Sequence, residues 1–317
     1  MQYIGEIISI GVAFSWTLTA MASEVATKHL GVFVSNVWRM MLAFLCSAAF
    51  MWFFTGTFIP HYADGTTWMW LLLSGVVGYF FGDWCLFNSY IWIGSRYGQL
   101  FMTLAPMVTA LAAWVALGQQ LSLQSLLAMA VTISGIVISV VSRVADSEDE
   151  SAKKKFKLAL PWQGVLFGIG AGVGQGVGLV LSKIGLDRYT AGVPASLLPD
   201  IENYLPFSAN MIRCIAGFFC FLVWMLLRKE GPNFMKSYRD RKGMSMLLMA
   251  VIFGPFLGVG FSLMAVQHTA AGIASTLMAT TPIIILLPSW YFFHQKITPK
   301  VVLGAVISVV GVSLFFL

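Results

Sequence analysis

Apolar segments of about 20 residues recur along this 317-residue chain, and they restrict its fold more than any other feature. A helix needs about 20 apolar residues to cross a bilayer. Ten such segments can be placed, at 4–25, 32–54, 68–91, 97–117, 124–142, 163–185, 207–227, 243–266, 271–292 and 300–317. The first lacks the basic start and the cleavage site of a signal peptide, so we interpret it as a span. The sequence therefore predicts ten transmembrane helices.

Composition agrees with a membrane location. Hydrophobic residues make up 58% of the chain and charged residues 10%, whereas about a quarter of a soluble domain is charged. The net charge of +6 lies in loops that flank the spans, and we expect no nucleic-acid partner. The four cysteines fall inside spans without a CxxC pair, so we interpret them as packing residues. The expected location is a cell membrane, the bacterial inner membrane, crossed several times.

The chain repeats itself in two halves, 1–143 and 161–317, joined by a charged linker at 144–160. Identical residues align between the halves at a shift of 176 or 174 residues. The pairs are Gly78 with Gly254, Gly82 with Gly258, Pro106 with Pro282, Trp114 with Trp290, Gly135 with Gly311, Asn36 with Asn210 and Arg39 with Arg213. Because each half has five spans, the halves must cross the membrane in opposite directions. The predicted fold is an all-α polytopic membrane protein with ten helices in two inverted five-helix repeats.

Glycine occupies every second position of "GIGAGVGQGVG" at 168–178. A phosphate-binding loop is excluded, because this segment lies inside an apolar run long enough to span. At a shift of 155 residues, five of the six aligned positions in the first span are also small, so both halves require a thin helix here. Two ridges of small residues would lie on nearly opposite sides, one formed by Gly168, Gly172 and Gly176 and the other by Gly170, Gly174 and Gly178. We expect this helix to be squeezed between a neighbouring helix and a cavity.

Each half ends in a proline-bearing span, a polar turn and a span with spaced glycines. These features are Pro106, "LGQQLS" at 117–122 and Gly135 in the first half, and Pro282, "HQKIT" at 294–298, Gly304 and Gly311 in the second. The pattern resembles the EamA-like family of the drug/metabolite transporter superfamily. The resemblance implies export or exchange of a small metabolite. The turn glutamate of the family is Gln119 in one half and Gln295 in the other, so a charged role at that position is not expected here.

Asp83 is the most informative ionisable residue, because it lies well inside the third span. Its aligned residue in the second half is Val259, so the symmetry of the scaffold does not require a carboxylate there. Ionisable groups within a span usually face a cavity or a partner. Two interpretations remain open: a carboxyl group that binds substrate or carries a proton, and a structural ion pair or helix-end carboxylate.

The basic residues inside spans also have two interpretations. Arg39 and Arg213 either act as gates or anion contacts, or belong to the scaffold together with Pro106 and Pro282. Glu24 and Lys28 are placed for an interfacial salt bridge. Lys183 has no such glutamate in its own half and is a candidate substrate contact. The other candidate substrate contacts have packing as their alternative role. Those for a polar path are Asn88, Gln99, Thr103, Gln175, Thr276 and Thr280, and those for flat apolar walls are Trp16 and Tyr97.

Lysine and arginine concentrate in alternate loops. The connections after spans one, three, five, seven and nine carry fifteen of the 19 basic residues, and the even connections carry only Arg188. Basic loops favour the cytoplasmic side of a membrane. The charge pattern therefore predicts both termini outside the cytoplasm, whereas the family resemblance implies both termini inside it.

These observations favour a secondary transporter, an exporter or exchanger that moves a small metabolite such as an amino acid by alternating access between the halves. The expected partners are the bilayer, the substrate and a proton as the candidate coupling ion, and the oligomeric state stays open. One alternative is a sugar-phosphate or nucleotide-sugar exchanger, with Lys183, Arg39 and Arg213 meeting the anion. Another is a membrane sensor or an intramembrane enzyme. No HExxH, GxSxG or metal-ligand spacing occurs, so we predict no catalytic residue, metal or cofactor.

Overall fold

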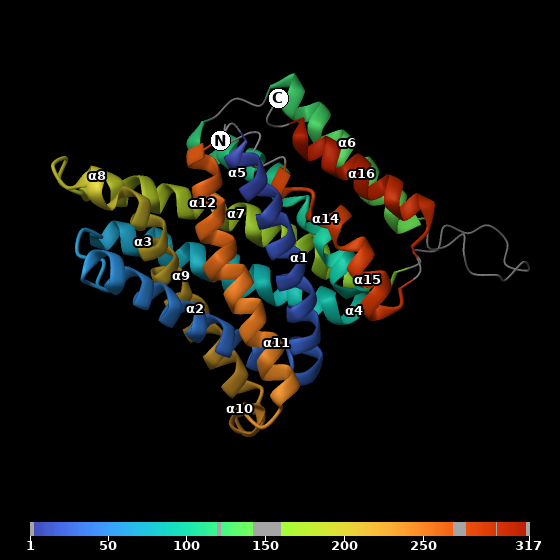
Figure 1. The fold of residues 1–317 in the computed structure, drawn as a ribbon, viewed down its shortest axis with the longest axis horizontal. Helices are drawn as coiled ribbons and strands as arrows, with labels where there is room; N and C mark the ends of the chain where they lie inside the picture. The colour runs from blue at the N-terminus through green and yellow to red at the C-terminus, as the bar shows by residue number, and fades with distance from the viewer. Residues whose placement is uncertain (1–2, 119–121, 142–159, 269–276, 296, 315–317) are drawn as a thin grey trace, which may run out of the picture.

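The computed structural model describes residues 3–118, 122–141, 160–268, 277–295 and 297–314, and the regular elements in these ranges are helices (Figure 1). The first half contains α1 (Ile4–Leu30), α2 (Val32–Thr55), α3 (Gly65–Ser74), a π-helix (Gly75–Gly82), α4 (Asp83–Met102), α5 (Ala105–Leu117) and α6 (Leu123–Val141). The second half contains α7 (Trp162–Gly192), α8 (Leu198–Ile201), a 3₁₀ turn (Glu202–Tyr204), α9 (Leu205–Leu227), α10 (Gly231–Ser237), α11 (Arg241–Val251), a π-helix (Ile252–Phe256), α12 (Leu257–His268), α14 (Thr281–Ile284), α15 (Leu286–Phe293) and α16 (Pro299–Ser313).

Seven helical segments in the described ranges are long and apolar enough to cross a membrane, so the protein is a multi-pass membrane protein. The apolar helices at predicted spans four, nine and ten are shorter, at Ala105–Ala116, Thr281–Phe293 and Pro299–Ser313. Pro106 and Pro282 explain why the helices at predicted spans four and nine are short, because each proline lies in the first turn of a new helix, α5 or α14. Proline is favoured there, where it has no backbone N–H to lose from the helix. Ten complete crossings therefore stay a prediction.

The first helix of each half packs against the third span of the other half. α1 packs on α11 and α12 of the second half, and α7 packs on α3, its π-helix and α4 of the first half. The corresponding helices α2 and α9 lie side by side, as do α6 and α16 (Figure 1). A Cβ atom at Gly135 of α6 would lie only 2.6 Å from the carbonyl oxygen of Gly304 in α16. The glycines that align between the halves are thus points of close helix contact.

The glycine ridges of α7 explain why this helix must be thin. Gly168, Gly172 and Gly176 face Phe101, Leu104 and Val108 of the α4–α5 segment. On the other side, a Cβ at Gly174 would lie 2.6 Å from the Cα of Gly82, and one at Gly178 would lie 2.7 Å from the Cα of Gly78. Both ridges therefore meet neighbouring helices. The expected cavity beside one ridge is wrong, because backbone from the first half fills that side.

Two π-helices stand at aligned positions of the halves, one before α4 and the other before α12. Each is crossed by the first helix of the other half, since Gly78 meets α7 and a Cβ at Gly254 would lie 2.8 Å from the Thr19 side chain of α1. Short π-helical segments often occur at functional sites. The first of them leads directly into α4, whose first residue, Asp83, is buried.

Several odd-numbered connections meet at one end of the structure. His29 at the end of α1 lies 2.9 Å from the carboxylate of Asp240, which caps α11. The backbone N–H of Gly243 and the His29 side chain lower the pKa of Asp240 from its ordinary value. The end of α1, the break at Gly94 within α4 and the α15–α16 connection also contribute residues to one pocket, described below. The basic connections for which these contacts are described therefore lie at one end of the structure.

We expect this end of the structure to be cytoplasmic, because basic loops are retained on that side. A protease-sensitive tag fused to the first residue should then be cleaved in intact spheroplasts. The control is the same tag inserted in the 144–160 linker, which should be cleaved only after lysis. A protected terminal tag together with a cleaved linker tag would reverse the orientation to the one that the family resemblance implies.

Candidate functional site

A buried polar cluster near the middle of the molecule centres on Asp83, whose exposed fraction is 2%. Arg39 of α2 forms an ion pair and hydrogen bond with one carboxylate oxygen of Asp83. Gln175 of α7 donates from Nε2 to the other oxygen at 2.8 Å and also reaches the carbonyl of Gly78 at 3.2 Å. The cluster therefore joins α2, α4 and α7 and spans both halves of the chain. Asp83 therefore forms the buried ion pair that one of its two interpretations predicted.

Arg213, the residue aligned with Arg39, has different surroundings. Its guanidinium lies 4.3 Å from the centroid of the Tyr79 ring, a cation–π distance. The Tyr79 hydroxyl donates to the amide oxygen of Asn210, whose amide nitrogen lies 3.4 Å from the Ser47 hydroxyl. Arg213 therefore has an aromatic partner where Arg39 has a carboxylate.

The two arginines lie at matching depths. Arg39 follows seven residues of α2 and Arg213 follows eight residues of α9. At about 1.5 Å of rise per residue, each is roughly 10–12 Å from the start of its helix. Because α2 begins after the first connection and α9 after the sixth, we expect the helices to enter from opposite membrane faces. The cluster would then lie near the bilayer midplane.

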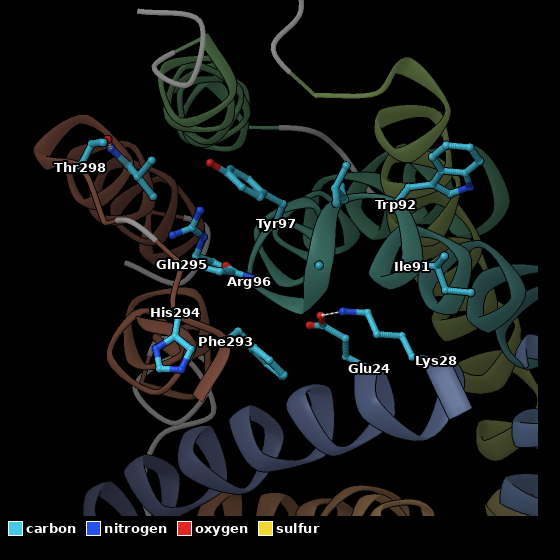
Figure 2. Close-up of a pocket in the computed structure, with 13 residues that line it drawn as sticks. Glu24, Lys28, Ile91, Trp92, Arg96, Tyr97, Phe293, His294, Gln295 and Thr298 are labelled. Atoms are coloured by element: carbon cyan, nitrogen blue, oxygen red, sulfur yellow. Dashed lines mark hydrogen bonds and ion pairs between the residues drawn. The ribbon is translucent and has the colours of Figure 1, made fainter. Parts of the chain in front are cut away.

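A pocket of about 630 Å³ lies at the other end of α4 (Figure 2). It is lined by Glu24, Lys28, Ile91, Trp92, Ile93, Gly94, Arg96, Tyr97, Phe293, His294, Gln295, Thr298 and Val301. Glu24 is only 1% exposed, and it accepts a 2.5 Å hydrogen bond from Lys28 and a 2.6 Å bond from the backbone N–H of Ser95. The carboxylate of α1 therefore holds the turn between spans three and four.

That turn depends on Gly94, where φ is +79° and the helix is broken. Residues with a Cβ rarely adopt this conformation. A Cβ at Gly94 would also lie 3.2 Å from Nε2 of Gln295, so the glycine lets α4 approach the α15–α16 connection. Arg96 lies over the Tyr97 ring at 4.6 Å, next to Gln295 in the view of Figure 2. Together these residues close one wall of the pocket.

Sequence reasoning missed Glu24, Gly94, Arg96 and Gln295 as pocket residues. Glu24 was expected in an interfacial salt bridge, and the ion pair with Lys28 does form, but the carboxylate is buried. The available signal was an acidic residue inside the first span. A single sequence does not show which turn such a residue would reach.

The predicted site residues divide into those that the structure brings together and those that it separates. Asp83, Gln175 and Arg39 meet in the cluster, and Tyr97 lines the pocket. Lys183 lies on an exposed part of α7, paired with Asp187 at 3.0 Å, away from both sites. Trp16 packs beside Gly258 of α12.

The remaining predicted residues make local hydrogen bonds. Asn88 donates to the carbonyl of Trp84 at 2.7 Å, and Gln99 donates to the Tyr90 hydroxyl at 2.8 Å. The hydroxyl of Thr103 donates to the backbone one turn before it at 2.7 Å, and that of Thr280 does the same at 2.6 Å. Thr276 lies outside the described residues. The bonds of Thr103 and Thr280 satisfy these side chains at the helix breaks before α5 and α14.

The fold and cluster together define a class: a helical membrane protein built from two matched halves that interlock around buried charges. The model of the EamA-like transporter family matches residues 3–141 and 162–317, and the chain belongs to this family. The resemblance inferred from the prolines, turns and glycines is therefore confirmed. The protein is a member of a family of membrane transporters of the drug/metabolite type.

The overall fold is also similar to that of a solved structure titled "Crystal structure of protein". The two share 14% sequence identity, with a TM-score of 0.62 over 99% of this chain and 97% of that chain. At this identity the likeness concerns the fold alone. No curated protein matches the sequence.

Proposed function

We propose that the protein is a secondary transporter that moves a small metabolite, such as an amino acid, by alternating access between its two halves. The observation that carries this proposal is the buried contact of Asp83 with Arg39 and Gln175. Family membership supports transport in general, and inverted-repeat transporters commonly bind substrate near the midplane between the repeats. The cluster joins α2 and α4 of the first half with α7 of the second, which supports such a site.

The chemistry of the cluster suits a movable contact. Buried ion pairs contribute little net stability, because desolvation offsets much of the attraction between the charges. A polar substrate that bonds to Asp83 or Gln175 would replace a contact between the halves with contacts to itself. The α2, α4 and α7 helices would then be able to rearrange. A proton is the candidate coupling ion, with Asp83 as the group that would receive it.

The sugar-phosphate or nucleotide-sugar alternative requires Lys183, Arg39 and Arg213 to meet the anion. Lys183 is paired with Asp187 on an exposed surface, and Arg39 is paired with Asp83. Arg213 is therefore the basic residue that best supports an anionic substrate. A sensor would bind its ligand without moving it, and an intramembrane enzyme would change the ligand chemically.

The proposed function predicts flux in proteoliposomes. Vesicles loaded with a mixed metabolite pool should release at least one unchanged compound, detected by mass spectrometry, and a pH gradient should change the rate if protons are coupled. Asp83→Asn should reduce the rate at least tenfold, because it removes the charge that Arg39 and Gln175 contact. Ser89→Ala is a matched control on the same helix, since that buried hydroxyl donates to the carbonyl of Leu86 in the helix itself.

Other outcomes separate the alternatives. Release of a chemically altered compound would select the enzyme. A well-folded protein that binds a compound but releases none would select the sensor. An Asp83→Asn variant with the wild-type rate and pH profile would remove Asp83 from the mechanism while leaving the transporter in place.

A further inference from the structure

The pocket of Figure 2 is built where three helical segments end or break. Lys28 stands in the last turn of α1, Gly94 breaks the helix between predicted spans three and four, and Phe293 ends α15. The Trp92 ring beside the break is 47% exposed. Tryptophan is enriched where membrane helices meet the lipid headgroups. We therefore expect this pocket at headgroup depth, apart from the buried cluster around Asp83.

Positive charge prevails among the side chains that line the pocket. Lys28 and Arg96 are cationic, and Glu24 is the acidic residue of the lining. The Glu24 carboxylate is buried and already accepts hydrogen bonds from Lys28 at 2.5 Å and from the backbone N–H of Ser95 at 2.6 Å. Its charge is therefore held inside the protein, whereas the Lys28 side chain is 48% exposed. The pocket thus presents net positive charge to a ligand.

The two cations differ in shape, and both suit a phosphate group. An ammonium has three N–H donors, of which Lys28 uses one for Glu24. Its Nζ atom also lies 5.6 Å from the centre of the Phe293 ring, a cation–π contact that positions it. The guanidinium of Arg96 lies 4.6 Å from the centre of the Tyr97 ring. Arginine binds phosphate through its planar donors, and lysine binds it as a point charge.

The first turn of α16 adds to the positive field. Thr298 caps this helix, since its hydroxyl accepts from the backbone N–H of Val301 at 3.4 Å, and both residues line the pocket. The N-terminus of a helix carries partial positive charge and favours anions. A lysine, an arginine and a helix N-terminus from three separate segments therefore converge on one space of about 630 Å³.

We propose that this pocket binds the phosphate group of an anionic phospholipid on the side of the membrane where the basic connections lie. Lys28 and Arg96 would contact the phosphate oxygens beside the first turn of α16, and the exposed Trp92 ring would lie against the start of the acyl chains. Basic pockets between transmembrane helices at the cytoplasmic surface bind such headgroups in other proteins. The lipid would bridge α1 and α4 of the first half with α16 of the second.

The test measures lipid binding by native mass spectrometry of the full chain in detergent, with phosphatidylglycerol or phosphatidylcholine added. We expect one phosphatidylglycerol to bind at least about tenfold more tightly than phosphatidylcholine, because two basic side chains face the headgroup. Thr298→Asp should abolish this preference, since its carboxylate repels the phosphate, whereas Thr298→Asn has the same shape without the charge and should keep it. Aspartate and asparagine are both good helix caps, so both variants should fold.

A second pair of variants tests the lysine. Lys28→Gln should weaken phosphatidylglycerol binding about fivefold, because one basic contact is removed while an amide donor remains for Glu24. Lys183→Gln is the matched control, since Lys183 forms the same kind of i,i+4 ion pair, with Asp187 on an exposed part of α7 outside the pocket. Its phosphatidylglycerol affinity should equal that of the wild type.

Soluble probes identify the source of the phosphate. Glycerol 3-phosphate and inorganic phosphate should not displace the bound lipid. If either binds in its place and loses affinity in Thr298→Asp, the phosphate site stands and the lipid is overturned as its occupant. Equal binding of the two lipids by the wild type overturns the inference, as does equal phosphatidylglycerol binding by the two Thr298 variants. None of these measurements involves transport, so their failure leaves the proposed function unaffected.

Discussion

Gly178→Leu should prevent α7 from packing on the first half, and we expect it to cause a large loss of stability. A Cβ at this position would lie 2.7 Å from the Cα and 2.9 Å from the backbone nitrogen of Gly78. Backbone cannot rotate away as a side chain can, so the two helices must separate. Overpacking typically costs about 1–3 kcal/mol and occasionally more, and contact with backbone places this case at the upper end. The measurement is the melting temperature of the purified protein in detergent.

The matched control is Gly11→Leu, which adds the same side chain to α1. A Cβ at Gly11 meets no atom within 4 Å, so the new leucine would face outward, where the protein contacts lipid. Its melting temperature should stay close to that of the wild type. Equal melting temperatures for Gly178→Leu and Gly11→Leu would show that the α7 contact with Gly78 is not tight.

The sequence predicted this contact in part. Alternating glycines indicated two thin faces of one helix, and the repeat indicated that the first span needs the same property. The residues on the opposite side were not predictable, because helix periodicity defines a face and says nothing about what covers it. The backbone of Gly78 and Gly82 therefore fills the space in which a cavity was expected.

The candidate site was predictable to a similar degree. Asp83 stood out because a carboxylate inside a span needs a partner, and Arg39 and Gln175 were both candidates. The local breaks were not predictable from one sequence. Gly94 and the π-helices depend on contacts with Glu24, Gln295 and the opposite half, which lie far away along the chain. Residue spacing reports local periodicity, whereas these features arise from tertiary contacts.

Asp83→Ala should strongly destabilise the protein, because it leaves the Arg39 guanidinium buried without its counter-ion. Removal of one member of a buried pair typically costs about 3–5 kcal/mol. The expected fall in melting temperature in detergent is roughly 10 °C for a chain of this size. The Gln175 amide would also lose the carboxylate oxygen that it contacts at 2.8 Å.

The double variant Asp83→Leu/Arg39→Met separates stability from function. Replacing both charges with apolar residues of similar volume is often neutral or stabilising, since no unpaired charge remains. We therefore expect the double variant to regain most of the lost melting temperature while proteoliposome flux stays at least tenfold below wild type. Recovery of both would show that the pair serves only the scaffold. If neither the melting temperature nor the flux recovers, the double variant has lost stability because the new side chains do not fit the site. A recovered melting temperature without flux is the result that assigns the Asp83–Arg39 charges to substrate movement.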